Sequence, residues 1–327
     1  MHFPSTSVKT SQPPLALGLD AGGTQTRWAL ATPDGQIAAS GELTGLSALQ
    51  AGHAAGLDAI ARIFAELAHS VAPHGRVGAI HAGITGYGGE AQALPQLLAH
   101  SFALPAASVC VKNDLEIAYL DIFEPGSGYL IYAGTGSIAA YIDQQGQFQR
   151  AGGRGYLLDD GGGGFWIARE ALRHIWRQED EQPGSWRHSP MARKLFAQMD
   201  CSDWDATRQF IYQRSRGEIG RLALAVAAAA DSDAIALDIL HRAGQELARL
   251  GMALCTRYGK KPLTLSGRVP ELHPVISETL RSCLPAGLSL QLSTCQAHLA
   301  AARLAAKQLR KHRLNQKASF PRKREPM

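Results

Sequence analysis

The chain has 327 residues, of which 45% are hydrophobic, and this length and composition predict a globular protein of two domains. The formal net charge of +5 comes from residues 307–327, which hold eight Lys or Arg and one Glu. The rest of the chain keeps 25 of the 33 basic and 27 of the 28 acidic residues, so it is nearly neutral. A basic chain end of this kind is typical of solvated, disordered tails, and we therefore expect no nucleic-acid partner.

The cysteines and the apolar runs argue against two further classes of protein: disulfide-rich or zinc-binding proteins, and membrane or exported proteins. The five cysteines are odd in number and form no C-x-x-C pair, so the sequence predicts neither a disulfide framework nor a zinc site. The longest apolar run, residues 222–230, is far shorter than the roughly 20 residues that span a bilayer, and the N-terminus lacks the apolar core of a signal peptide. We therefore expect a cytoplasmic protein that does not enter a membrane.

Apolar periodicity and turn residues predict alternating strands and helices in the first part of the chain. After a loose tail over residues 1–14, the predicted elements are strands at 16–23, 26–32 and 36–43, a helix at 47–71, a strand at 76–86, a helix at 91–102, a strand at 108–114 and a helix at 115–123.

The second part begins as a repeat of the first. Residues 128–153 again predict a strand, a glycine–threonine turn, a strand, a polar turn with a glycine and a third strand. This internal repeat predicts two related domains. The elements predicted after it are helices at 165–177, 217–230 and 234–258, a strand with a glycine turn at 261–270, a short helix at 274–280, a strand at 288–293 and a closing helix at 295–311.

The stretch LALGLDAGGTQT, residues 15–26, has the chemistry of a phosphate cradle. A buried strand would carry the carboxylate of Asp20 to a fixed point, and glycines without a Cβ atom let backbone N–H groups approach a phosphoryl oxygen. A plain β-hairpin, in which the glycines only make the turn, is equally compatible with this stretch alone.

Four segments in order resemble a known family: DAGGTQT, KNDLEIAYL, IYAGTGSIAAYI and GGRGYLLDDGGGGFWIAREAL. They are similar to the N-acetylglucosamine kinase group of the BadF/BadG/BcrA/BcrD ATPase family, within the superfamily of acetate and sugar kinases, heat-shock chaperones and actin. The resemblance implies an α/β fold of two related actin-like (ribonuclease H-like) domains, with mixed sheets flanked by helices and an ATP cleft between them. We expect these domains at residues 15–125 and 126–310, with disordered tails at 1–14 and 311–327.

The resemblance also implies an activity, which is the phosphorylation of an amino sugar, N-acetylglucosamine or glucosamine, at its primary hydroxyl. ATP and Mg²⁺ would be the cofactors, and the protein would form a homodimer. Asp114 matches the general base, although an aspartate after a short strand is also a common helix N-cap. Asp20 would hold Mg²⁺ through water. The implied phosphate contacts are Gly22, Gly23, Thr24, Gly134, Thr135 and Gly136, with Gly267 in the adenosine loop.

The implied sugar contacts are Gly153, Arg154, Gly155, Asp160, Ser137, Thr85 and Ser47. For Ser47 and Thr85, an ordinary turn or cap role is at least as compatible with the sequence. The family usually has Gly-Asp-Glu-Gly where this chain has Asp-Asp-Gly-Gly at 159–162, and Arg154 and Arg268 replace an aromatic residue and a glycine. These departures leave the identity of the sugar open.

Two other classes share this fold. An ATPase activator of acyl-CoA dehydratases or reductases needs cysteine ligands for an iron–sulfur cluster, and no cysteine here has a cluster-like spacing. A non-catalytic sugar sensor is disfavoured because Asp20 and Asp114 are both present.

Overall fold

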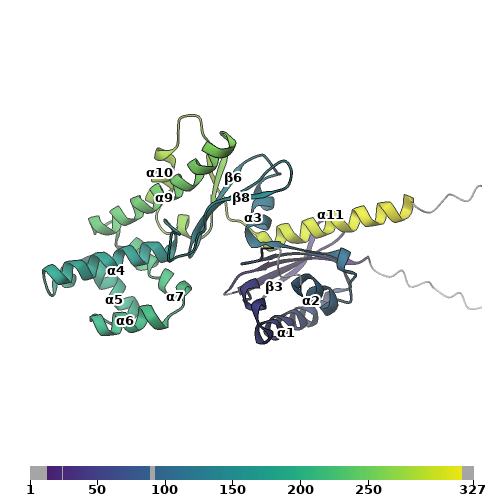
Figure 1. Ribbon diagram of the computed structural model, residues 1–327, viewed down its shortest axis with the longest axis horizontal. Helices are drawn as coiled ribbons and strands as arrows, with labels where there is room; N and C mark the ends of the chain where they lie inside the picture. The colour runs from purple at the N-terminus through teal and green to yellow at the C-terminus, as the bar shows by residue number, and fades with distance from the viewer. Residues whose placement is uncertain (1–12, 24, 89–92, 319–327) are drawn as a thin grey trace, which may run out of the picture. The chain divides into compact units, whose positions relative to one another are not determined.

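The computed structural model describes the backbone of residues 13–23, 25–88 and 93–318, and the side chains up to residue 311. The chain forms two compact units, one made of residues 1–121 with 296–327 and the other of residues 122–295 (Figure 1). The expected tail at 1–12 and the end of the chain from residue 319 lie outside the described residues.

The first unit is a five-stranded mixed sheet with helices on both faces, in the strand order β3-β2-β1-β4-β5. Its elements are β1 (Leu15–Ala21), β2 (Gln25–Ala31), β3 (Ile37–Thr44), α1 (Ala54–Val71), β4 (Val77–Ile84), α2 (Ala93–Ser101), β5 (Val109–Asn113), α3 (Asp114–Ile122) and α11 (Ala297–Ala318).

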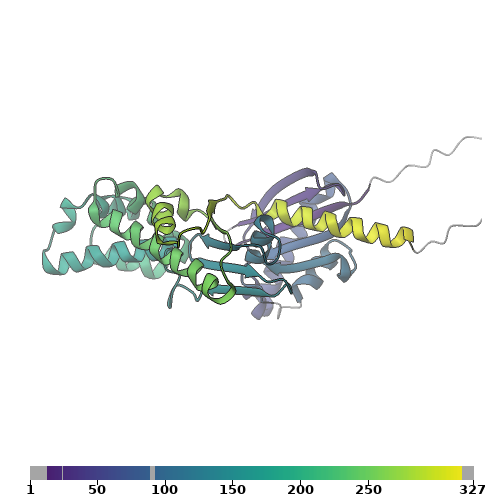
Figure 2. The ribbon, with the colours of Figure 1, turned by 90° about the horizontal axis from the view of Figure 1, so that it is seen from above.

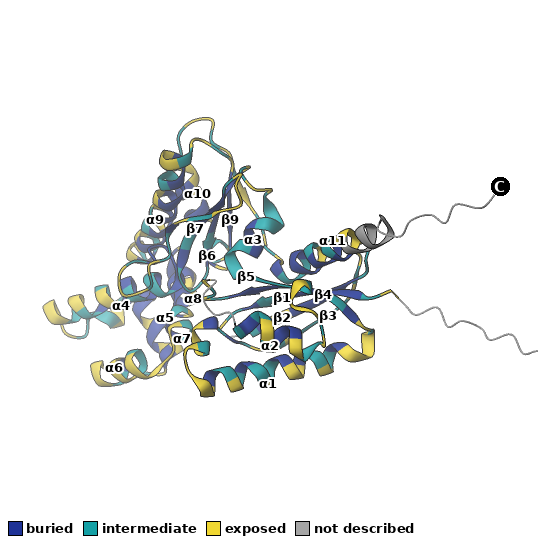
Figure 3. Cartoon of the chain, turned by 45° about the vertical axis from the view of Figure 1, so that its right-hand side comes forward, coloured by how far each residue is buried: buried dark blue, intermediate teal, exposed yellow. Residues whose placement is uncertain are grey.

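The alternation of large and small residues along β1 decides which helix packs on which face. Leu17 and Leu19 belong to the core cluster that includes Phe64 of α1, whereas Ala16 packs in a second cluster with Ala302 of α11. Successive residues of a strand point to opposite faces. The large residues therefore meet α1 and α2, and the small residues let α11 approach closely (Figures 2 and 3).

Helix α11 differs from the sequence-based expectation. We assigned the closing helix to the second domain, but it packs on β1 in the first unit, where a Cβ atom at Gly18 would overlap the backbone of Ala302. The helix also continues to Ala318, so residues 311–318 of the expected tail are helical. Sequence periodicity shows that a helix is amphipathic but does not show which sheet it covers.

The second unit contains another five-stranded mixed sheet, in the order β10-β9-β6-β7-β8. Its elements are β6 (Tyr129–Ala133), β7 (Ser137–Ile142), β8 (Phe148–Gly152), α4 (Gly164–Glu181), α5 (Pro190–Met199), α6 (Trp204–Gln213), α7 (Arg216–Gly220), α8 (Ala223–Ala229), α9 (Ala234–Tyr258), β9 (Leu263–Ser266), α10 (Pro274–Cys283) and β10 (Leu290–Leu292).

The two sheets have the same topology, which confirms the α/β fold of two related domains. In each, three antiparallel strands follow one another along the chain, and two parallel strands extend the sheet from the first of the three. Strands β1 to β5 thus correspond to β6 to β10. The glycine-containing turns β1–β2 and β6–β7 occupy equivalent places, as the internal repeat predicted.

Several helices differ from the predicted ones. The predicted helix at 47–71 is a 3-10 helix, Ala48–Gly52, followed by α1, because the side chain of His53 caps a new helix start. The Ala-rich stretch predicted as one helix forms α7 and α8, and α5 and α6 were not predicted. Among the described helices, none is long and apolar enough to cross a membrane.

The close approach of α11 to β1 predicts a strong effect of Gly18→Ala. The added methyl group would overlap helix backbone that cannot rotate away, so we expect a loss of about 3 kcal/mol in the free energy of unfolding. Urea unfolding measures this loss, and hydrogen exchange should show reduced protection of α11.

Gly52→Ala is the matched control, because a Cβ atom there meets nothing within 4 Å. We expect it to change stability by less than about 1 kcal/mol. Equal losses in the two variants would contradict the packing of α11 on β1.

Candidate active site

Two aspartates lie at the carboxyl ends of parallel strands in the first unit. Asp20 lies near the end of β1, and Asp114 begins α3 directly after β5. Strand β4 runs between these strands, and its Gly83 pairs with Asp20. A Cβ atom at Gly83 would lie 3.1 Å from the Cα atom of Asp114, so the start of α3 rests on bare backbone. The fold therefore brings both aspartates to one edge of the sheet.

Burial shifts the titration of both carboxyl groups. It is the main cause that raises the pKa of Asp20 to about 6, the negative charge of Asp114 adds to the rise, and Arg27 opposes it. Burial also raises the pKa of Asp114, against hydrogen bonds from the Thr85 hydroxyl and the Leu115 N–H. Such a pair fits a site for a divalent cation, because the cation would neutralise the two carboxylates. It also fits a role in proton transfer, because a carboxyl group with a raised pKa accepts a proton more readily.

Thr85 and Ser47 contact each other beside Asp114. The carbonyl of Thr85 accepts hydrogen bonds from the Ala48 N–H at 2.9 Å and from the Ser47 hydroxyl at 3.3 Å. Ser47 also caps the following 3-10 helix, since its hydroxyl accepts a bond from the Leu49 N–H. The cap role left open for Ser47 is thus present, whereas the side chain of Thr85 contacts the acid directly.

The β1–β2 turn holds the first glycine pair. Gly22 donates its N–H to the Gln25 carbonyl at 3.0 Å and accepts a bond from the Leu46 N–H at 3.0 Å. Gly23 is exposed, and a Cβ atom there would meet nothing within 4 Å. Thr24 lies outside the described residues. The backbone of Gly23 is therefore the open part of this turn.

The second glycine turn, between β6 and β7, is held by the start of α4. The N–H of Gly134 donates to the Gly136 carbonyl at 2.9 Å. The N–H groups of Gly164 and Phe165 donate to the carbonyls of Gly134 and Thr135 at 2.8 and 3.0 Å. The first turn of α4 thus braces the loop predicted to hold phosphate.

Asp160 lies buried over this second turn. It is 4% exposed, and a Cβ atom at Gly136 would overlap its carboxylate. Its backbone has φ +61°, a conformation that few residues other than glycine adopt. The Arg216 guanidinium lies 3.4 Å from Oδ2. Burial raises the pKa of Asp160, while Arg216 and a hydrogen bond from the Gly155 N–H oppose the rise.

Three other predicted sugar contacts, Ser137, Gly153 and Arg154, differ from one another in exposure and in hydrogen bonds. Ser137 is 3% exposed and donates its hydroxyl to the Gly161 carbonyl at 2.6 Å, so it braces the loop. Gly153 donates its N–H to the Ser137 carbonyl at 3.1 Å. Arg154 is exposed, next to Gly155. Gly153 and Arg154 therefore share the loop after β8, with Arg154 at its surface, and Ser137 contacts this loop from the start of β7.

Gly267 lies beside a hollow that includes the second glycine turn. Its φ is +99°, and a Cβ atom there would overlap the Ala133 carbonyl, so only glycine fits. The hollow has a volume of about 90 Å³ and is lined by Gly134, Thr135 and Arg268, with further walls from α7 and α8. The predicted phosphate turn and the predicted adenosine loop therefore meet within the second unit.

Sequence reasoning missed the contribution of α7. Its Arg216 pairs with the buried acid of the sugar loop, and a Cβ atom at Gly220 would lie 3.2 Å from the methyl group of Thr135. A signal was available, because Ser215 and Glu218 form an S-x-x-E capping box that marks the start of this helix.

Glu246 of α9 places a carboxylate beside Gly161, the position at which the family resemblance leads us to expect a second acid. A Cβ atom at Gly161 would lie 2.8 Å from Oε2 of Glu246. Glu246 pairs with Arg249 at 2.7 Å, and Arg249 also reaches Asp159 at 3.2 Å. The glycine thus makes room for an acid that comes from another element.

The electrostatic coupling of Asp20 and Asp114 can be tested by titration. In metal-free protein, Asp114→Asn should lower the pKa of Asp20 from about 6, because one negative neighbour is removed. The value should stay above 3.8, since burial still raises it. Carboxyl-carbon NMR across pH measures the shift.

Asp58→Asn, at an exposed position of α1, is the control and should leave the titration of Asp20 unchanged. An Asp20 pKa that does not respond to Asp114→Asn would show that the two groups do not interact.

Comparisons with known proteins agree with this fold. A segment of 74 residues is 32% identical to an N-acetylmuramic acid/N-acetylglucosamine kinase of Clostridium acetobutylicum, and it covers 23% of this chain and 24% of that relative. The match thus spans about a quarter of the relative's length.

Solved structures show the same fold over nearly the whole chain. A candidate N-acetylglucosamine kinase of Chromobacterium violaceum is 24% identical with a TM-score of 0.67, over 90% of this chain and 99% of that one. One from Porphyromonas gingivalis is 17% identical with a TM-score of 0.71, over 91% and 99%. A ROK family glucokinase of Streptomyces griseus, in complex with glucose and AMPPNP, is 18% identical with a TM-score of 0.57, over 90% and 98%.

The sequence model of one family matches most of the chain, from residue 17 to residue 282. This chain therefore belongs to the BadF/BadG/BcrA/BcrD ATPase family.

Proposed function

We propose that this protein is an ATP-dependent kinase that phosphorylates the primary hydroxyl of an amino sugar, N-acetylglucosamine or glucosamine. The observation that carries the proposal is the half-buried pair Asp20 and Asp114 at one sheet edge, in a member of an ATPase family. The curated relative with kinase activity on N-acetylated sugars supports the sugar class.

Asp114 is the proposed general base. Burial raises its pKa, which makes it a better proton acceptor near neutral pH than an ordinary aspartate. Hydrogen bonds from Thr85 and from the Leu115 N–H orient the carboxylate that would accept the proton of the sugar hydroxyl. Phosphoryl transfer needs little more covalent assistance, because positioning and charge neutralisation do most of the work.

Asp20 is the proposed magnesium residue. Its raised pKa and its carboxylate neighbour fit a cation that would neutralise both groups. Within the described parts of the chain, no group of three or more His, Cys, Asp and Glu side chains forms a closed metal site. This fits Mg²⁺, which keeps several waters and uses few protein ligands. When bound, Mg²⁺ would neutralise phosphate charge.

The glycine turns are the proposed phosphate contacts, and the sugar loop is the proposed specificity element. Gly23, Gly134 and Gly136 offer backbone without side chains, and Arg268, the neighbour of Gly267, lines the hollow proposed for adenosine. Asp160, held by Arg216, would bind sugar hydroxyls through charge-assisted hydrogen bonds. Homodimerisation, which the family resemblance implies, is part of the same proposal.

Release of ADP from Mg-ATP tests the proposal across glucosamine, N-acetylglucosamine, glucose, N-acetylmannosamine and N-acetylmuramic acid. We expect release that depends on at least one amino sugar. Release that is independent of every sugar, or none from folded protein, would overturn the kinase assignment. A brown, iron-containing protein would favour the electron-transfer activator instead.

Asp114→Asn should retain sugar binding and lose most of the transfer rate, by about 10² to 10⁴-fold, because the amide cannot accept the proton. Calorimetry with the sugar and steady-state ADP release measure the two quantities. Asp58→Asn serves again as the control and should keep full activity. A variant at Asp114 with the wild-type rate would remove that residue from the role of base.

A further inference from the structure

A cavity in the second unit lies outside the candidate active site. It has a volume of about 370 Å³ and is formed by α4, α6 and α7. No residue that lines it also lines the hollow beside Gly267. A volume of this size falls within the range of small-molecule sites, which begins at roughly 300 Å³.

One part of the cavity is aromatic and aliphatic. The rings of Trp176 and Trp204 meet edge to face, with centroids 5.4 Å apart. Phe165, Leu172 and Ile211 add to this surface. Trp204 remains 49% exposed although it is large and apolar, so the wall is open to an incoming molecule.

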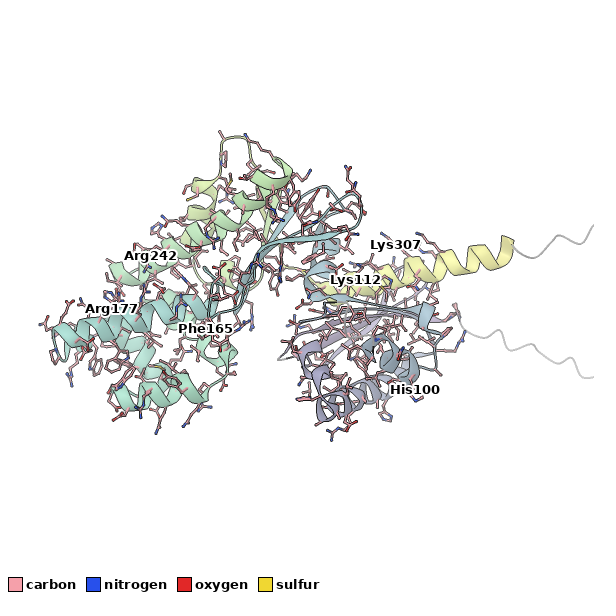
Figure 4. All side chains as sticks on the ribbon, viewed as in Figure 1. His100, Lys112, Phe165, Arg177, Arg242 and Lys307 are labelled. Carbon is pink, nitrogen blue, oxygen red and sulfur yellow. The ribbon has the colours of Figure 1, made fainter. Side chains whose placement is uncertain are left out.

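The same cavity is also lined by positively charged side chains. Arg169, Arg173 and Arg177 line the cavity and are four residues apart on α4, so they share one face of the helix. Figure 4 labels Phe165 near the start of this helix and Arg177 further along it. Asp180 also lines the cavity and reduces the positive charge at the end of the row.

The three arginines of α4 differ in the ion pairs that they form. Arg169 and Arg173 both pair with buried Glu170, which also receives Arg242 from α9, so this carboxylate is shared by three cations. Arg177 forms no ion pair with any side chain that the structure describes. The indole N–H of Trp176 is buried and has no hydrogen-bond acceptor among the described residues. An anionic group would complement Arg177, and a hydrogen-bond acceptor would satisfy the indole N–H of Trp176.

We propose that this cavity binds a small amphipathic anion, with a flat apolar body against the tryptophans and an acidic group at Arg177. Burial of the apolar body supplies most of the binding free energy, and the charge-assisted hydrogen bond selects an anion over a neutral molecule of the same shape. This assignment does not depend on the kinase proposal, because the cavity shares no lining residue with the hollow beside Gly267.

Two fluorescent dyes of similar shape test the assignment on the full-length protein. The probe is 8-anilinonaphthalene-1-sulfonate, and N-phenyl-1-naphthylamine is its neutral counterpart. We expect one sulfonate dye to bind per chain. Arg177→Gln should weaken it about fivefold, with the neutral dye affected less than twofold, and Trp176→Phe should weaken the sulfonate dye about threefold.

Arg193→Gln is the matched control, because Arg193 is exposed on α5 and lies outside the cavity. It should leave both affinities unchanged. Equal weakening by Arg193→Gln, or sulfonate binding that Arg177→Gln does not change, would overturn the proposal.

Competition experiments exclude other occupants. Saturating Mg-ATP should leave the dye bound, so displacement by ATP would place the dye in the hollow beside Gly267 and contradict the assignment. A second copy of the chain could also cover the cavity. In that case dye binding would fall as protein concentration rises, light scattering would show dimers, and the assignment would fail.

Discussion

The candidate site depends on the partial burial of two acidic side chains at the same edge of one sheet. Asp20 and Asp114 approach each other because β4, which lies between their strands, has glycine at position 83 and lets α3 begin against its backbone. Burial raises the pKa of both groups. A pair whose burial is offset only in part, by Arg27 and by hydrogen bonds from Thr85 and Leu115, is unfavourable in a folded protein. Its presence therefore points to a ligand that brings positive charge or takes part in proton transfer.

The second unit has the same sheet topology, but different residues surround its glycine turn. Its glycine turn corresponds to the turn after Asp20, but its acid, Asp160, lies in the loop between β8 and α4 and is held by Arg216. This loop bends over Gly136, where a side chain would overlap the carboxylate. Duplication of one sheet thus provides two glycine turns, and the helical additions of the second unit provide the groups around them.

Local patterns predicted most of the strands of each unit, whereas the roles of the candidate site residues came from the family resemblance and stay predictions. The alternation of Leu with Ala and Gly in β1 and the repeat of the glycine turn are signals of period two and of internal symmetry, and both are present in the structure. The placement of α11 on β1 was not predictable, because an amphipathic helix does not encode its partner sheet. Contacts such as Glu246 with the space at Gly161 also depend on elements far apart in the sequence.

Phosphorus NMR of a reaction mixture tests the central claim most directly, because it separates transfer to a sugar from transfer to water. With Mg-ATP and the preferred amino sugar, our account predicts a phosphomonoester signal of the sugar that grows in step with ADP. Formation of ADP with inorganic phosphate alone would contradict it and would identify the protein as an ATPase without a sugar acceptor.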